Sequence, residues 1–327
     1  MRTEKSGIAL CGNLIVDQIH HIPSYPNVGE LTKITGLDRS VGGCVPNVGI
    51  DLKRICPELS VSAIGRIGND ENGRYVRSVL EQNGLELSGL KTTDEPTSFT
   101  QVMSVSGGQR TFFTYAGADG GLTADDVVFS EKLPKILHLG YFLLLKKVDE
   151  GEGIKILKKA VEAGIATSVD LVSENSDRYA LVLPCLKYTE YLIINELEAG
   201  NLTGIEPKRE NLEQIARKLL ALGVRKKVLL HRTDCAVCCS EAGFTAVPSY
   251  DVPKEDIVGT TGAGDAFCAG ALYAIHEGRS DREILEFASA AAVMALRSAD
   301  ATAAMCSEAE IMEHCKRYDR RKLCWSI

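Results

Sequence analysis

Short apolar runs and amphipathic stretches alternate along most of this chain. The apolar, β-branched runs predict buried strands, and they cover residues 7–19, 61–65, 135–140, 165–170, 191–194 and 227–231. The stretches with apolar residues at helical spacing lie between or after them, at 74–82, 152–163, 211–222 and 281–297. This alternation predicts an α/β fold with a doubly wound, mostly parallel sheet and helices on both faces. The prolines and glycines at 23–36 do not mark a second core, so we expect a single domain over residues 1–327.

One pair of strands in the first half of the chain departs from this alternation. Residues 98–105 and 111–115 alternate apolar and polar side chains around Ser106-Gly-Gly-Gln109, which predicts a β-hairpin. One interpretation is an edge hairpin that packs on the core. The other is a small separate sheet that covers a binding site.

The stretch Ile257-Val-Gly-Thr-Thr-Gly-Ala-Gly-Asp-Ala-Phe267 joins an extended segment to an apolar helix. Thr260 and Thr261 are residues that can cap the helix start. The Gly-Ala-Gly that follows is small enough for a ligand to approach bare backbone, and a helix N-terminus attracts phosphate. Asp265 stands in the first turn, either as a catalytic base or as an ordinary charge that favours the helix dipole. The chain contains no P-loop string and no G-x-G-x-x-G after a strand, so neither of those nucleotide motifs explains this stretch.

Other polar residues and glycines stand where predicted strands end or helices begin. Ligands bind at the carboxyl ends of strands in open parallel sheets, so these positions are candidates for a site. Taken locally, the same residues are also typical of a turn-forming asparagine, a tight glycine turn and a helix N-cap. The candidates are Asn13 with Asp17, Gly42-Gly43 with Asn47, and Asn195 with Glu198.

The segment Gly259-Thr-Thr-Gly-Ala-Gly-Asp265 resembles the second signature of the PfkB (ribokinase-like) family of sugar and nucleoside kinases, D-T-x-G-A-G-D. Gly42-Gly-Cys-Val-Pro-Asn47 is similar to that family's first signature, G-G-x-x-x-N. The family's G-N-x-x-x-D strand end and N-x-x-E element match at 12–17 and 195–198. The motifs follow the family's order over nearly the whole chain. The resemblance implies a ribokinase-like fold in which about 15–40 and 97–117 form a small β-sheet lid.

The resemblance also implies a role for each matching residue. Asp265 would deprotonate a substrate hydroxyl, while the amides of Gly262, Ala263 and Gly264 would hold the transferring phosphoryl group. Carboxylate and amide oxygens suit Mg²⁺, a hard ion held largely through water. The implied activity is ATP-dependent phosphorylation of a small sugar, with Mg²⁺ as cofactor. The remaining roles are substrate binding by Asn13, Asp17, Gly42, Gly43 and Asn47, nucleotide binding by Asn195, Thr260, Gly264 and Ser289, and a Mg²⁺ site at Glu198 and Asn195.

Two other functions are compatible with the same residues. A nucleoside kinase of the family would use the same chemistry, and apolar lid residues that stack on a base would favour it. A non-catalytic sugar- or nucleotide-binding relative would retain the fold, but the intact Asp265 argues against it.

Three segments depart from the family's pattern. Gly259 replaces the aspartate that binds the cation in K⁺-activated members, so we expect weak or absent K⁺ activation. Residues 231–236 contain no glycine, although the family has a glycine-rich turn along the nucleotide there. Residues 170–178 lack the family's D-x-N-x-R spacing and give no substrate assignment.

Composition limits the partners further. The 37 basic and 44 acidic residues give a net charge of −7, which argues against a surface for nucleic acid or an anionic membrane. No apolar run is long enough to span a membrane, and the first residues lack the apolar core of a signal peptide, so we expect a cytoplasmic protein. The 11 cysteines, including the C-x-x-C at 235–238, are expected to be reduced and structural. A homodimer through the lid is compatible with the resemblance.

Overall fold

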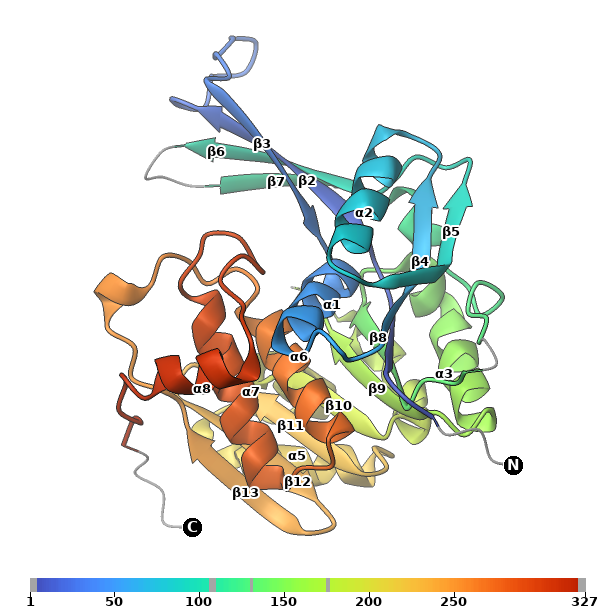
Figure 1. Ribbon diagram of the computed structural model, residues 1–327, viewed down its shortest axis with the longest axis vertical. Coiled ribbons are helices and arrows are strands. Elements are labelled where there is room, and N and C mark those ends of the chain that lie inside the picture. The colour runs from blue at the N-terminus through green and yellow to red at the C-terminus, as the bar shows by residue number, and fades with distance from the viewer. Residues whose placement is uncertain (1–4, 106–109, 130–131, 175–176, 323–327) are drawn as a thin grey trace.

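The computed structural model describes residues 5–105, 110–129, 132–174 and 177–322, and its centre is one large sheet (Figure 1). The strands of this sheet are β1 Ile8–Cys11, β4 Val61–Gly68, β5 Glu86–Thr93, β8 Ile136–Phe142, β9 Ala166–Leu171, β10 Tyr191–Asn195, β11 Lys227–His231, β12 Cys235–Ser240 and β13 Gly243–Pro248. Within the described residues, these nine strands have the order β13-β12-β11-β10-β9-β8-β1-β4-β5. Neighbours from β11 to β5 pair in parallel, whereas β12 and β13 are antiparallel at one edge.

Helices cover both faces of the sheet. They are α1 Cys44–Ile55, α2 Glu71–Gln82, α3 Gly153–Glu162, α4 Glu196–Thr203, α5 Leu212–Ala221, α6 Ala263–His276, α7 Asp281–Ala295 and α8 Glu308–Cys315. On one face α1, α2, α6, α7 and α8 bury one apolar cluster, and on the other α3, α4 and α5 bury a second (Figure 1). The predicted doubly wound α/β fold, with its mostly parallel sheet, is therefore confirmed.

The C-x-x-C segment lies within β12, where successive side chains point to opposite faces of the sheet. Cys235 packs in the cluster on one face and Cys238 in the cluster on the other. The two thiols therefore do not converge on a shared ligand, in agreement with their predicted structural role.

Four strands form a second, smaller sheet that projects from the main body (Figure 1). These strands are β2 Ile15–Ile22, β3 Gly36–Gly42, β6 Phe99–Val105 and β7 Arg110–Tyr115, in the order β3-β2-β6-β7 among the described residues. The predicted hairpin is present as the antiparallel pair β6 and β7, and its turn at 106–109 lies outside the described residues. Parallel pairing of β2 with β6 joins the hairpin to the earlier segment. The hairpin thus belongs to a separate lid sheet and not to an edge of the main core.

The connections between these elements contain short helical turns. Turns of 3-10 geometry lie at Gly117–Gly121, Arg178–Leu181, Leu183–Tyr188, Arg209–Asn211 and Lys254–Asp256, and a π turn at Val148–Glu152 precedes α3. In the part of the chain that the structure describes, every helix is too short or too polar to cross a membrane. The carboxyl ends of β8, β9 and β10 meet beside the first turn of α6, where they line a common cavity.

Candidate active site

Asp265 lies in the first turn of α6, and its side chain is almost fully buried. Its Oδ2 accepts a 2.9 Å hydrogen bond from Asn47 Nδ2 in α1 and another of 2.9 Å from the Tyr141 hydroxyl at the end of β8. Burial raises the pKa of Asp265 to about 7, and the negative charge of Asp170 adds to the shift. Because both bonds end on Oδ2, Oδ1 is free to accept a proton, and a pKa near neutrality suits a general base.

The start of α6 is built differently from the predicted threonine cap. Gly262 is the N-cap residue, with a φ of 80°, and no side chain caps this helix. A Cβ at Gly262 would lie 2.6 Å from the Ala301 carbonyl oxygen, so both the backbone conformation and the space require glycine. The prediction that Thr260 or Thr261 caps α6 was therefore wrong. The Ala263 amide donates a 3.3 Å hydrogen bond to the Thr260 carbonyl oxygen, and the amides that follow it in the first turn have no side-chain cap, which is the arrangement that binds anions.

A cavity of about 570 Å³ opens between the lid and the start of α6. The lid contributes Val102, Arg110 and Phe112 to its wall, and the segment at 299–301 closes another side. The cavity brings together four of the five predicted substrate residues with the predicted base, namely Asp17, Gly42, Gly43, Asn47 and Asp265.

Asp17 of β2 lies diagonally opposite Gly42 of β3, which pairs directly with Ile15. A Cβ on Gly42 would overlap Oδ2 of Asp17, so the glycine makes room for this carboxylate. Burial raises the pKa of Asp17 to about 6, and the charge of Asp300 adds to the shift, while a hydrogen bond from Thr100 opposes it. A carboxylate of this kind, half-enclosed in a polar cavity, is suited to accept hydrogen bonds from hydroxyl groups.

Asn13 is the predicted substrate residue that does not line this cavity. Its side chain is buried, and Oδ1 accepts a 2.9 Å hydrogen bond from the Cys44 amide. The carbonyl oxygen of Asn13 lies 2.7 Å from the position of a Cβ on Gly43, whose φ is 96°. Asn13 therefore packs against the Gly42-Gly43 turn from the protein interior. It fixes the position of two residues that line the cavity but does not line the cavity itself.

A smaller cavity, of about 190 Å³, continues from Asp265 to the carboxyl ends of β9 and β10. Asn195 and Glu198 line it and form a capping box for α4, with Asn195 Oδ1 accepting from the Glu198 amide and Glu198 Oε2 accepting from the Asn195 amide. The local N-cap interpretation is thus correct for both residues. The capping interaction does not exclude the predicted role at a Mg²⁺ site, since both side chains still border the cavity.

The chemistry around Glu198 fits the expected Mg²⁺. The side chain is buried, and burial raises the pKa of Glu198 to about 7. Its two oxygens accept one bond each, from Ser173 and Asn195, and a carboxylate oxygen has a further lone pair for a metal-bound water. A buried carboxylate beside an open cavity is a site where a dication is favourable, and oxygen donors are the ligands that Mg²⁺ prefers.

A third cavity, of about 390 Å³, lies on the other side of the α6 start. Thr260, Gly264 and Ser289 line it together with apolar side chains such as Phe267 and Val293. The buried Ser289 hydroxyl has no hydrogen-bond partner among the described residues. Among the predicted nucleotide-binding residues, Asn195 does not line this third cavity but lines the smaller one beside Glu198.

The turn between β11 and β12 borders this third cavity and contains no glycine. Asp234 forms ion pairs with Arg209 and Arg232, and these hold the turn. Arg232 also lines the cavity, so the turn presents a cationic side chain where the family has glycines.

Tyr141 also belongs to the site, although its sequence context does not predict this. This residue has a φ of 55°, its amide donates to Asp170 Oδ1 at 2.5 Å, and its hydroxyl donates to Asp265. A tyrosine at the end of an apolar strand resembles any core aromatic residue. Only the positive φ and the spatial contact, neither of which the sequence shows, mark it.

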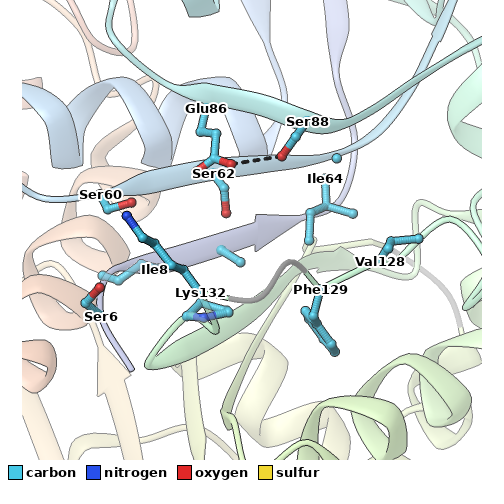
Figure 2. Close-up of a pocket in the computed structure, with 13 residues that line it drawn as sticks. Ser6, Ile8, Ser60, Ser62, Ile64, Glu86, Ser88, Val128, Phe129 and Lys132 are labelled. Atoms are coloured by element: carbon cyan, nitrogen blue, oxygen red, sulfur yellow. Dashed lines mark hydrogen bonds between the residues drawn. The ribbon is translucent and has the colours of Figure 1, made fainter. Parts of the chain in front are cut away.

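Figure 2 shows another cavity, of about 390 Å³, at the opposite end of the sheet. Ser60, Ser62 and Glu86 line it at the beginnings of β4 and β5, together with Lys132. It contains none of the predicted site residues. The predicted residues lie instead around the start of α6, at the carboxyl ends of β8, β9 and β10 and under the lid.

Residues 7–308 match the pfkB family of carbohydrate kinases. The chain belongs to this family. Its members are phosphotransferases, so the predicted enzyme class is confirmed at that level.

Individual relatives are more distant. The chain is 26% identical to a ribokinase of Arabidopsis thaliana over 89% of its own length and 76% of that protein. It is also 26% identical to fructokinase-1 of Zea mays, over 92% and 95% of the two chains. The solved structure of Arabidopsis thaliana ribokinase complexed with ribose and ATP superimposes with a TM-score of 0.79 at 23% identity, covering 96% of this chain and 99% of that one. This likeness confirms the ribokinase-like fold.

Proposed function

We propose that this protein transfers the γ-phosphoryl group of ATP to a hydroxyl group of a small sugar. The observation that carries the proposal is the position of the α6 start. Asp265 lines both the cavity under the lid and the one that leads to Glu198, while Gly264 lines the latter and the Ser289 cavity. An acceptor, a phosphoryl group and a nucleotide can therefore meet at one buried carboxylate and one helix N-terminus.

Asp265 acts as the base in this proposal. Its Oδ1 accepts the hydroxyl proton while the substrate oxygen attacks the γ-phosphorus, and the bond from that phosphorus to the bridging oxygen of ADP breaks. The amides of Gly262, Ala263 and Gly264 stabilise the negative charge on the transferring group at the N-terminus of α6. Catalysis of this kind relies on positioning and electrostatics.

The remaining predicted residues take the following roles. Asp17, Asn47 and the amides of Gly42 and Gly43 orient the substrate under the lid, with Asn13 as the residue that positions the glycine turn. Thr260, Gly264, Ser289 and Asn195 contact the nucleotide. Glu198 and Asn195 would hold Mg²⁺ largely through water, and the ion would neutralise phosphate charge.

A nucleoside kinase of the same family is the second candidate. Phe112 lines the cavity from β7 of the lid, and an aromatic face of this kind can stack on a base. The same residue can also pack on the apolar face of a sugar ring, so it does not by itself select the nucleoside.

A substrate panel tests the proposal. ATP consumption with Mg²⁺ is measured for ribose, fructose, 2-keto-3-deoxygluconate, sugar phosphates and nucleosides, with wild-type protein, Asp265→Asn and the control Asp256→Asn. Asp256 is exposed, and its carboxylate accepts a hydrogen bond from the Tyr318 hydroxyl, so its variant controls for the loss of one carboxylate. We expect turnover on a sugar that Asp265→Asn reduces at least ~100-fold and Asp256→Asn leaves intact. Near wild-type turnover in Asp265→Asn would reject the base, and ATP binding without turnover on any acceptor would favour the non-catalytic relative.

We further propose that the chain works in the cytoplasm as a single kinase domain that forms a homodimer through the lid. Large apolar side chains are exposed on the lid and the segment between β2 and β3, among them Val28, Leu31, Leu37 and Phe113. Light scattering of wild-type protein and Phe113→Glu tests the dimer. A monomeric wild-type protein would reject it.

A further inference from the structure

Three buried side chains with metal-binding atoms converge directly behind Asp265. His138 belongs to β8, Asp170 to β9 and Cys268 to α6, and their exposed fractions are 1%, 7% and 2%. The His138 Nε2 atom lies 3.5 Å from Asp170 Oδ2 and 3.6 Å from Cys268 Sγ. All three ligand atoms lie within 4.8 Å of one another. None of the three is assigned to the acceptor, the nucleotide or Mg²⁺ above, and Asp170 acts on the proposed base only through its charge.

The ring of His138 is oriented as a metal ligand requires. Its Nδ1 lies 3.1 Å from the Ser168 hydroxyl, and when Nδ1 donates to that oxygen, Nε2 keeps its lone pair toward the other two atoms. Metal-binding histidines commonly use their second nitrogen in this way, because the outer bond fixes the ring and its tautomer. Asp170 is anchored similarly, with Oδ1 accepting from the Tyr141 amide and Oδ2 left toward His138.

The spacing of the ligand atoms suits zinc. Zn²⁺ lies about 2.0–2.1 Å from histidine nitrogen and carboxylate oxygen and about 2.3 Å from thiolate sulfur, which places tetrahedral ligand atoms roughly 3.3–3.6 Å apart. The two distances from His138 Nε2, 3.5 and 3.6 Å, already match, and only Cys268 Sγ and Asp170 Oδ2 need to approach each other. A donor set of nitrogen, sulfur and oxygen favours Zn²⁺ over Mg²⁺.

An ion can reach this cluster from the active site. Asp170 and Cys268 line the cavity of about 190 Å³ that also holds Asp265 and Glu198. Because Asp170 and Cys268 border this cavity, a water from it can complete the four ligands, as in zinc sites that are not purely structural.

We propose that His138, Asp170 and Cys268 form a Zn²⁺ site that opens onto the active-site cavity. Binding displaces the Cys268 thiol proton to solvent, so that a thiolate, a carboxylate and a neutral imidazole hold the ion. A second consequence rests on the proposed function. A dication bound beside Asp265 opposes proton transfer to that carboxylate, so Zn²⁺ inhibits the kinase reaction even when Mg²⁺ is in excess.

Metal binding is tested first, without reference to activity. Reduced, chelator-treated full-length protein is titrated with Cd²⁺, whose thiolate charge-transfer absorption reports sulfur ligation, and Zn²⁺ affinity is obtained by competition. The variants are Cys268→Ala, Asp170→Asn and the control Cys238→Ala, which removes a buried thiol of the C-x-x-C segment. Thermal unfolding checks that each variant is folded.

We expect one Cd²⁺ per chain with a thiolate band in wild-type protein and in Cys238→Ala. Cys268→Ala should lose the band and weaken Zn²⁺ binding at least ~100-fold, more than loss of an outer-shell group. Asp170→Asn should keep the band and weaken affinity, because it retains the thiol and loses one charged ligand. A band that persists in folded Cys268→Ala, or that disappears in Cys238→Ala, would overturn the site.

Inhibition is tested separately. With MgATP and an accepted sugar, Zn²⁺ should inhibit wild-type protein and Cys238→Ala at similar concentrations, and Cys268→Ala should require at least ~100-fold more. Equal sensitivity in all three would reject the inhibitory role. If no acceptor is phosphorylated, the proposed kinase function fails, while the Cd²⁺ titration still decides whether the site exists.

Discussion

The Asn47 side-chain amide donates a 2.9 Å hydrogen bond to the carboxylate of Asp265, 218 residues further along the chain. The bond joins α1 to α6 and links the motif predicted to orient the acceptor with the one predicted to deprotonate it. Together with the Tyr141 bond, it favours the charged carboxylate, whereas burial and the charge of Asp170 favour the neutral acid. The balance leaves the pKa of Asp265 near neutrality, which has measurable consequences.

The first consequence is a pH-dependent rate. Because the base must be deprotonated to act, kcat/KM should rise about tenfold per pH unit below the pKa of about 7 and level off above it. Steady-state kinetics on an accepted sugar across this range tests the expectation. A profile that is flat from about pH 5 to 8 would show that another group accepts the proton.

The Tyr141→Phe variant should shift the midpoint of this pH–rate profile. It removes one hydroxyl hydrogen bond from Asp265 Oδ2 and retains the ring. Because the bond stabilises the carboxylate, its loss should move the midpoint of the profile upward by about one pH unit. A lower maximum rate with an unchanged midpoint would instead indicate that Tyr141 acts only on geometry.

Asp265→Asn should become increasingly stabilising as the pH rises. The pKa of Asp265 is about 7 in the folded protein and about 3.9 in an unfolded chain, so the folded state binds more protons between these values. Stability attributable to this carboxyl is therefore present at low pH and lost as pH rises toward 7. Thermal unfolding should show little difference at about pH 4 and a Tm at least about 2 °C above wild type at about pH 8. A variant less stable than wild type at the higher pH would contradict this sign.

Two glycines of the α6 start should respond differently to alanine. Gly262→Ala puts a Cβ 2.6 Å from the Ala301 carbonyl in a left-handed conformation, so it should lower the free energy of unfolding by at least ~1–2 kcal/mol. At Gly264 the new Cβ would meet only His231 Cε1, at 3.7 Å, so stability should hold. Its methyl group would nevertheless enter the path of the phosphoryl group and reduce kcat/KM about 100-fold. Denaturant titration and kinetics on both variants separate the two effects, and comparable stability losses would refute the distinction.

The enzyme should not depend on K⁺. A Cβ at Gly259 would lie 2.8 Å from the Ser298 carbonyl oxygen, so the backbone leaves no room for the aspartate that K⁺-activated members use. Exchanging Na⁺ for K⁺ at constant ionic strength should change the rate by less than the roughly fivefold minimum typical of coupled sites. Gly259→Asp should destabilise the protein without creating K⁺ activation. Strong activation of the wild-type enzyme by K⁺ would overturn the prediction.

Prediction from the sequence succeeded where a residue's role follows from its neighbours along the chain. The alternation of strands and helices, the lid hairpin and the Gly-Ala-Gly-Asp turn are local patterns, and the structure contains all three. The Thr260 and Thr261 cap failed because contact with Ala301, far along the chain, selects Gly262 as the N-cap. The contact of Tyr141 with Asp265 and the interior position of Asn13 could not be predicted for the same reason. Each depends on contacts between elements that are distant in the sequence.

The lid is a sheet of its own, attached to the main body through the ends of four strands. It supplies Asp17, Val102 and Phe112 to the cavity, whereas the base and the helix N-terminus come from α6 in the main body. Substitutions on the lid can therefore alter which acceptor is held without disturbing the carboxylate that reacts. Because acceptor contacts and the reacting carboxylate lie on separate parts of the fold, related proteins can evolve new substrate specificities through a few lid substitutions while they retain the same reaction.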